Sequence, residues 1–126
     1  METPENHIHT STTCNKHLSA VSDALYVIGG KWNLKIIIAL SDGPARFNDL
    51  QRRITGISAR VLSNELKEME MNGFVARTVF ADGPVIVEYS LTPYSETVKP
   101  IITALSDWGI KHREKIMNES RQANLS

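Results

Sequence analysis

Between Phe47 and Leu91 the spacing of apolar residues changes along the chain, from steps of three and four residues to strict alternation. The first spacing places apolar side chains on one face of a helix, and the second places them on one face of a strand. The pattern predicts, in order, helices over residues 48–54 and 59–71 and strands over residues 75–80 and 85–91. A mainly α chain with a small antiparallel β-sheet in this order is typical of a winged helix-turn-helix.

The helix predicted over residues 59–71 can be bounded from the chemistry of its ends. Ser58 is a favourable N-cap, because its hydroxyl can accept a hydrogen bond from a first-turn amide that has no partner within the helix. At the other end, Asn72-Gly73 supplies a residue that tolerates positive φ, and Phe74 can fold back on Met69. We therefore expect a Schellman ending at this glycine.

At about 100° per residue, the same helix has two distinct faces. Apolar Leu62, Leu66 and Met69 fall on one face, and the opposite face carries Arg60, Ser63, Asn64 and Lys67. Short donors and acceptors combined with longer cations can reach base edges and phosphates in a major groove. An ordinary solvated helix face has a similar composition, so the interpretation depends on the surrounding elements.

The preceding segment supplies that context. Asn48 is the candidate N-cap of the helix over residues 48–54, and Thr55-Gly56-Ile57 forms the turn after it. A short turn with a glycine lets two helices cross steeply, which places the second across a DNA groove and the first over the backbone. Arg52 and Arg53 then become candidates for phosphate contacts.

The two predicted strands form a hairpin, the wing of this fold, with Asp82-Gly83-Pro84 as its turn. A two-stranded sheet is marginal on its own in water, so we expect it to lean on the helices and on a third short strand. Residues 45–47 are the candidate for that strand.

Length and composition fit one domain, because 126 residues with 41% apolar side chains can fill a single core. The 14 basic and 14 acidic side chains cancel, which excludes a broadly basic coat. Between Arg46 and Arg77, however, there are six cations and four anions, so the local field is positive. The modest net charge implies weak non-specific binding, which dimerisation would reinforce.

Apolar residues at helical spacing also flank the motif. Two N-terminal sets are expected to lie in the core: Leu18, Val21, Leu25 and Ile28, ending at Gly29-Gly30, and then Trp32, Ile36, Ile37 and Leu40. Thr92 and Pro93 predict the cap and first residue of a C-terminal helix that reaches about residue 118, with a kink at Pro100.

The apolar seam of this C-terminal helix is wider than a domain of this size can cover. We expect it to pair with the same helix of a second chain, together with the N-terminal helix. The predicted dimer interface comprises Leu18, Val21, Leu25, Ile101, Leu105, Trp108, His112 and Ile116.

The polar residues 1–15 and 121–126 are expected to be flexible tails around a single winged-helix DNA-binding and dimerisation domain over residues 16–120. No apolar run is long enough for a signal peptide or a membrane span. The sequence therefore predicts a cytoplasmic protein with no membrane partner.

With these residues in view, the chain resembles the HxlR family of bacterial winged-helix transcriptional regulators, relatives of the MarR type. The similar stretches follow the family order over most of residues 14–113: Ile28-Gly29-Gly30-Lys31-Trp32, Gly43-Pro44-Ala45-Arg46-Phe47-Asn48-Asp49-Leu50, Gly56-Ile57-Ser58, Val61-Leu62 with Leu66 and Glu70, Gly73-Phe74-Val75-Ala76-Arg77, and Val87-Glu88-Tyr89-Ser90-Leu91-Thr92-Pro93. The resemblance implies a homodimer on a palindromic operator, with one recognition helix per subunit in successive major grooves. It also implies a regulator of nearby genes, usually a repressor and sometimes an activator, with Ser58, Arg60, Ser63, Asn64 and Lys67 as the reading residues.

The sequence departs from the family at the wing. Family members often carry a basic residue just before the Val-Glu-Tyr run, whereas this chain has Ile86, and no Lys or Arg occurs from Thr78 to Val98. We therefore expect the wing only to support the complex or to contact the DNA backbone lightly. Arg77, at the base of the wing, is the nearest cation. The complete candidate DNA-binding set is Arg46, Arg52, Arg53, Ser58, Arg60, Ser63, Asn64, Lys67 and Arg77.

Cys14 is the only cysteine, so an intrachain disulfide is impossible. One interpretation is an inert, partly buried thiol or a tail residue. The other is a sensor of oxidants or electrophiles, because Lys16, His17 and a nearby helix start all favour the thiolate. Some members of the family sense oxidants through a cysteine in this region, so an oxidant or a small molecule is the candidate effector.

Other chemistry is weakly represented. His7, His9, Cys14 and His17 contain zinc-binding groups, but their spacing matches no compact motif and no metal site is expected. Tyr26, Trp32 and Trp108 either line a ligand cleft or belong to the core. Without a phosphate loop, a nucleophile elbow or paired carboxylates on a common face, neither enzymatic activity nor a cofactor is expected. The alternative to a DNA-binding regulator is a winged helix that binds protein.

Overall fold

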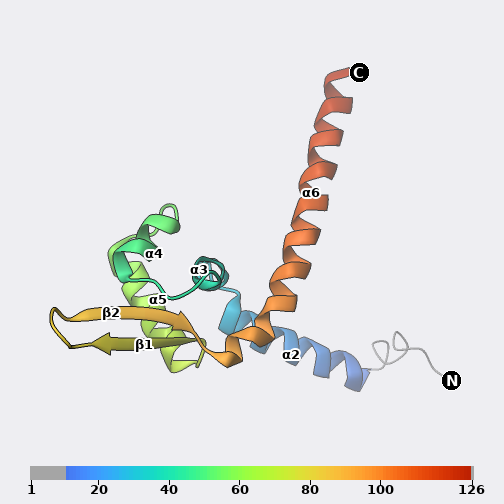
Figure 1. The fold of residues 1–126 in the computed structure, drawn as a ribbon. Coiled ribbons are helices and arrows are strands. Elements are labelled where there is room, and N and C mark those ends of the chain that lie inside the picture. The colour runs from blue at the N-terminus through green and yellow to red at the C-terminus, as the bar shows by residue number, and fades with distance from the viewer. Residues whose placement is uncertain (1–10, 126) are drawn as a thin grey trace.

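The computed structural model describes residues 11–125. Its elements are, in chain order, α2 (Ser11–Ile28), α3 (Asn33–Leu40), α4 (Phe47–Arg53), α5 (Ala59–Met71), β1 (Val75–Phe80), β2 (Ile86–Leu91), the 3-10 helix η1 (Pro93–Val98) and α6 (Lys99–Leu125). In Figure 1, α3, α4, α5 and the β1–β2 hairpin gather into one unit, which we call the body, and α2 and the long α6 project away from it. The mainly helical winged helix-turn-helix predicted from the sequence is confirmed.

The body encloses the hydrophobic core. Its most deeply buried side chains come from α3, α4, α5 and β1: Ile36, Ile37, Leu40, Leu50, Leu62, Leu66, Met69 and Val75. Each aliphatic side chain buried in this way contributes about 1.5–3 kcal/mol. The inward face predicted for α3 is confirmed at Ile36, Ile37 and Leu40, and Trp32 is half-buried against the core.

Both ends of α5 lie where residue chemistry placed them. The Ser58 hydroxyl accepts a hydrogen bond from the Val61 amide at 3.2 Å. At the C-terminus Gly73 has a φ of +84°, which allows Phe74 N–H to donate to Met69 O at 2.9 Å. Gly73 N–H donates to Glu70 O at 3.1 Å, which completes the Schellman motif.

The shorter helix α4 begins earlier than predicted, with its N-cap two residues before Asn48. Its N-cap is Arg46, with extended φ and ψ of −82° and 162°, and no side chain caps it. The assignment of Asn48 as the cap was therefore wrong, because Phe47 is already helical. Gly56 has a φ of +86° in the turn to α5, as the predicted glycine turn requires.

The hairpin pairs β1 with β2 in antiparallel register, from Val75 opposite Leu91 to Phe80 opposite Ile86. The predicted third strand at residues 45–47 was wrong in extent, because only Ala45 pairs, in a single bridge to Tyr89. The two backbone hydrogen bonds of that bridge measure 2.9 and 2.8 Å. Entry into α4 at Phe47 ends the pairing.

The chain after β2 also differs from the prediction. Thr92 is the N-cap of η1, but its hydroxyl donates to Gly73 O instead of capping the helix. The segment runs as a 3-10 helix to Val98 and becomes α-helical at Lys99. In place of a kink inside one helix, Pro100 is the second residue of α6, where a missing N–H costs no intrahelical bond.

The terminal helices are longer than the domain limits drawn from the sequence. α2 begins at Ser11 and α6 ends at Leu125, so residues 11–15 and 121–125 are helical. The core positions predicted on α2 were wrong for Leu18, Val21 and Leu25, which are exposed, and right for Ile28. α2 projects away from the body (Figure 1), and the body does not cover these three side chains.

Candidate nucleic-acid interface

The outward face of α5 is polar and accessible. Arg60, Asn64 and Lys67 are exposed and Ser63 is half-buried, whereas Leu62, Leu66 and Met69 on the opposite face are at most 2% exposed. The burial of the apolar face fixes the rotation of the helix about its axis, because turning it would expose three core side chains. The core therefore determines which side chains α5 presents to solvent.

The sheet positions two further cations of the predicted set, Arg77 and Arg46. Tyr89 pairs across the hairpin with Arg77 and on its other side with Ala45, which directly precedes Arg46. Both arginines are exposed. One strand residue thus sets the backbone positions from which two candidate phosphate-binding side chains extend.

A hollow of about 420 Å³ lies between α5 and the hairpin, and we call it the α5–wing hollow. Its lining includes Ser63, Lys67 and Arg77 from the predicted set, together with Glu70 and Tyr89. Glu70 and Tyr89 were not among the predicted DNA-binding residues, because the hollow forms only where α5 and the hairpin meet in the folded chain. The hollow brings two cations together on the same side of the body.

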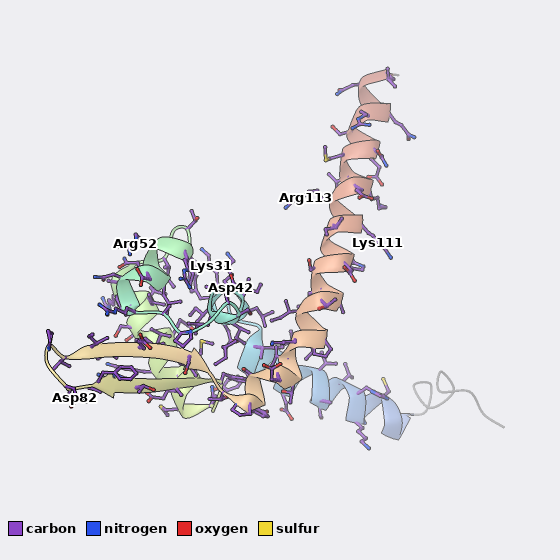
Figure 2. The ribbon with its side chains drawn as sticks, viewed as in Figure 1. Lys31, Asp42, Arg52, Asp82, Lys111 and Arg113 are labelled. Atoms are coloured by element: carbon purple, nitrogen blue, oxygen red, sulfur yellow. The ribbon has the colours of Figure 1, made fainter. Side chains whose placement is uncertain are left out.

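Three members of the predicted set already have partners within the chain. Arg52 forms an ion pair with Asp49 on α4, and Arg53 Nη1 donates to Ala39 O at 3.1 Å. The Ser58 hydroxyl is engaged as the helix cap. Arg52 lies on the outer side of α4 in Figure 2, where its ion pair is solvent-exposed and weak.

The wing has an apolar and acidic tip. Val79, Phe80 and Val85 are exposed there, and Asp82 lies at the end of the hairpin (Figure 2). A carboxylate at this point repels phosphates, so the tip adds no electrostatic attraction to DNA. Arg77, at the base of β1, is the one Lys or Arg residue within residues 75–91.

A second exposed surface extends over α2 and α6, and we call it the terminal-helix surface. All eight residues of the predicted dimer interface are exposed: Leu18, Val21, Leu25, Ile101, Leu105, Trp108, His112 and Ile116. A mainly apolar hollow of about 380 Å³ lies between the two helices, with Val21, Leu25 and Leu105 in its lining. His112 stacks on Trp108 with ring centroids 4.9 Å apart.

Other candidate chemistry is dispersed. Cys14 is half-buried on α2, and within residues 11–125 no cluster of His, Cys, Asp and Glu side chains is placed to hold a metal ion. His7 and His9 lie outside the described residues. The three aromatic rings considered for a ligand cleft have different surroundings: Trp32 lies beneath the Lys31 and Lys35 ammonium groups, Trp108 stacks on His112, and Tyr26 is exposed.

Comparison with known proteins identifies the family. The family model described as "HxlR-like helix-turn-helix" matches residues 27–117, more than half of the chain. The chain is 38% identical over 96 residues to the helix-turn-helix-type transcriptional regulator YdeP of Bacillus subtilis, covering 76% of this chain and 75% of the relative. A regulator of the same type from Methanothermobacter thermautotrophicus is 37% identical over 109 residues, covering 86% and 83% of the two chains.

A solved structure supports the same assignment. The redox regulator HypR in its reduced form superposes with a TM-score of 0.72 at 37% identity, covering 79% of this chain and 98% of HypR. No helix in the described part of the chain is long and apolar enough to cross a membrane. On these grounds the chain belongs to the HxlR-like helix-turn-helix family of transcriptional regulators.

Proposed function

We propose that this protein is a cytoplasmic, non-enzymatic repressor that binds a palindromic DNA operator as a homodimer. The observation that carries the proposal is the outward face of α5, where Arg60, Asn64 and Lys67 are exposed on a helix whose rotation is fixed by the core. Asn can pair bidentately with adenine and Arg with guanine in the major groove. In this arrangement Arg60 and Asn64 read bases, and Arg46 and Arg77 hold the backbone.

The terminal-helix surface supplies the dimer. Leu18 is 61% exposed and Trp108 is 64% exposed, and α6 has no buried residue within the chain. Contiguous apolar surface of this kind is typical of a protein interface. Pairing across a twofold axis would present two α5 helices, and an operator then needs half-sites about 34 Å apart, one turn of duplex.

The test is binding of a fluorescent duplex from the region beside the protein's own gene, measured by anisotropy at several salt concentrations. We expect Asn64→Ala to weaken binding to this operator about tenfold or more and to leave binding to unrelated duplex unchanged. Arg46→Ala should weaken binding to both duplexes and reduce the salt slope by about one.

A matched control is Lys111→Ala, which removes an exposed cation from α6, far from α5 in Figure 2. It should leave both affinities unchanged. Little duplex affinity at any salt concentration would contradict the proposal and favour a winged helix that binds protein. Equal losses on both duplexes for Asn64→Ala would reject base reading by α5.

We further propose that Cys14 makes the repressor responsive to oxidants. HypR, to which the chain is 37% identical, is a redox regulator, and Cys14 is half-buried on α2, next to the terminal-helix surface. With one thiol per chain, oxidation ends in a sulfenic acid, a mixed disulfide with a small thiol, or a bridge between subunits. We expect diamide to release the operator from the native protein and not from Cys14→Ser. Equal release from both proteins, or from neither, would reject the role of this thiol.

A further inference from the structure

The α5–wing hollow holds more polar groups than its two cations. Ser63, Lys67 and Glu70 follow one another at steps of four and three residues along α5, so their side chains share one helix face and line the hollow together. Arg77 and Tyr89 are direct cross-strand partners, which places both side chains on the same face of the hairpin. The two faces meet at the hollow, which therefore gathers side chains from α5, β1 and β2.

Tyr89 is held by the core and keeps a free polar end. The residue is half-buried and packs against the hydrophobic core. Its hydroxyl makes no hydrogen bond to another side chain or backbone group within residues 11–125. A tyrosine with a packed ring and an unpartnered hydroxyl presents that hydroxyl to water. Because Tyr89 also lines the hollow, its hydroxyl is available there as an uncharged donor.

Glu70 adds a negative charge to the same hollow. Its side chain is exposed, and none of the ion pairs found among residues 11–125 includes Glu70, Lys67 or Arg77. The two cations and one carboxylate in the lining leave one net positive charge. The hollow therefore attracts an anion, but less strongly than its cations alone would.

We propose that the α5–wing hollow binds one backbone phosphate of the operator, with the Tyr89 hydroxyl as a third donor beside Lys67 and Arg77. Phosphate oxygens accept hydrogen bonds from hydroxyl, ammonium and guanidinium groups. The inference rests on the proposed function, in which the outward face of α5 enters the major groove. Ser63 and Lys67 belong both to that face and to the hollow, so a phosphate in the hollow lies next to the bases that α5 reads.

In this arrangement the Glu70 carboxylate weakens the contact for every DNA sequence. A phosphate contact does not distinguish sequences, so it strengthens specific and non-specific binding together. The Tyr89 hydroxyl positions the duplex without adding charge, and Glu70 lowers the electrostatic attraction. The hollow thus orients the duplex while the sequence-independent affinity stays low.

The hydroxyl is tested with the full chain, in the anisotropy assay and with the two duplexes described for the proposed function. Tyr89→Phe should weaken binding to both duplexes about tenfold, because a hydrogen bond to a charged group is lost. The salt slope should stay unchanged, whereas Lys67→Gln should reduce it by about one, because only the lysine carries a charge. Tyr94→Phe, which removes a hydroxyl from a tyrosine outside this hollow, is the matched control and should bind as the native protein does.

The carboxylate is tested in the same assay. Glu70→Gln should strengthen binding to both duplexes at least about threefold, because its repulsion of the phosphate is removed. Glu114→Gln, at an exposed carboxylate on α6, changes the net charge by the same amount and should leave both affinities unchanged.

The contrary results are specific. Native affinity in Tyr89→Phe, or a loss confined to the operator, would overturn the phosphate contact. Native or weaker affinity in Glu70→Gln would overturn the opposing role of the carboxylate. If Tyr89→Phe fails to fold by circular dichroism, Glu70→Gln, at an exposed side chain, still decides the question. Absence of duplex binding by the native protein would overturn the proposed function and this inference together, whereas native behaviour of both variants in a protein that binds its operator would overturn the hollow alone.

Discussion

The body and the terminal helices differ in how far one chain can bury its apolar side chains. In the body, helices and hairpin face one another, and side chains such as Leu50 and Leu62 are fully buried. On α6, residues at equally regular spacing remain exposed, and Leu105 is 52% exposed. The same helical pattern therefore has two meanings. It marks a core where a partner element lies within the chain, and on α6 it marks a surface that we propose to be an interface with a second chain.

The largest expected effect distinguishes a leucine in the core from a leucine on the exposed face of α6. Leu50→Ala should lower the free energy of unfolding by about 3 kcal/mol, because the cavity forms in a fully packed core. Leu105→Ala should change it by less than about 0.5 kcal/mol in dilute protein, where the chain is monomeric. Urea denaturation followed by circular dichroism measures both.

Protein concentration sharpens the same comparison. The denaturation midpoint of the native protein should rise with concentration if the terminal helices pair, and Leu105→Ala should remove that rise. A large loss of stability for Leu105→Ala in dilute protein would mean that α6 packs on the body of its own chain. A midpoint independent of concentration in the native protein would argue against the dimer.

A smaller effect is expected at Gly73, which follows the C-terminus of α5. Gly73 has a φ of +84°, and an added Cβ would meet only Tyr94 Cδ2 at 3.9 Å, an ordinary contact. Gly73→Ala should therefore cost about 1–2 kcal/mol through the backbone alone. Gly30→Ala, at a glycine with negative φ and open space around it, is the control and should cost much less. Thermal unfolding of the two variants compares them, and equal losses would show that conformation at Gly73 is not the cause.

Within the body, local chemistry was sufficient to predict most of the fold. Ser58 and Gly73 bound α5 because caps and positive φ are local requirements that few residues satisfy. The prediction failed where the tertiary environment redirected a side chain. Thr92 was expected to cap a helix, but the Gly73 carbonyl offers its hydroxyl an acceptor from elsewhere in the fold.

The candidate site was predictable only as a list of side chains. The helical periodicity of α5 placed Arg60, Asn64 and Lys67 on the outward face. It could not show that Arg53 contacts Ala39, or that Tyr89 aligns Arg46 and Arg77, because these relations join residues that are distant in sequence. The hollow that Asn33 and Glu65 line together could not be predicted for the same reason, since the two residues are brought together only in the folded chain.

The smallest expected effect lies at Glu65 on α5, and it depends on pH. Burial, and then the Glu68 carboxylate, raise the pKa of Glu65 above its ordinary value, so between the unfolded and folded pKa values the native state holds more protons than the unfolded state. Stability from this group is therefore complete below the unfolded pKa and is lost as pH rises through the folded pKa. Above that window the ionised side chain is a net cost, and Glu65→Gln removes it.

We accordingly expect Glu65→Gln to be slightly more stable than the native protein at about pH 7 and to lose that advantage at about pH 4, where the native carboxyl is protonated. Urea denaturation at the two pH values measures the difference, and Glu114→Gln should show none. A variant less stable than the native protein at neutral pH would mean that a cationic group within the chain already compensates Glu65.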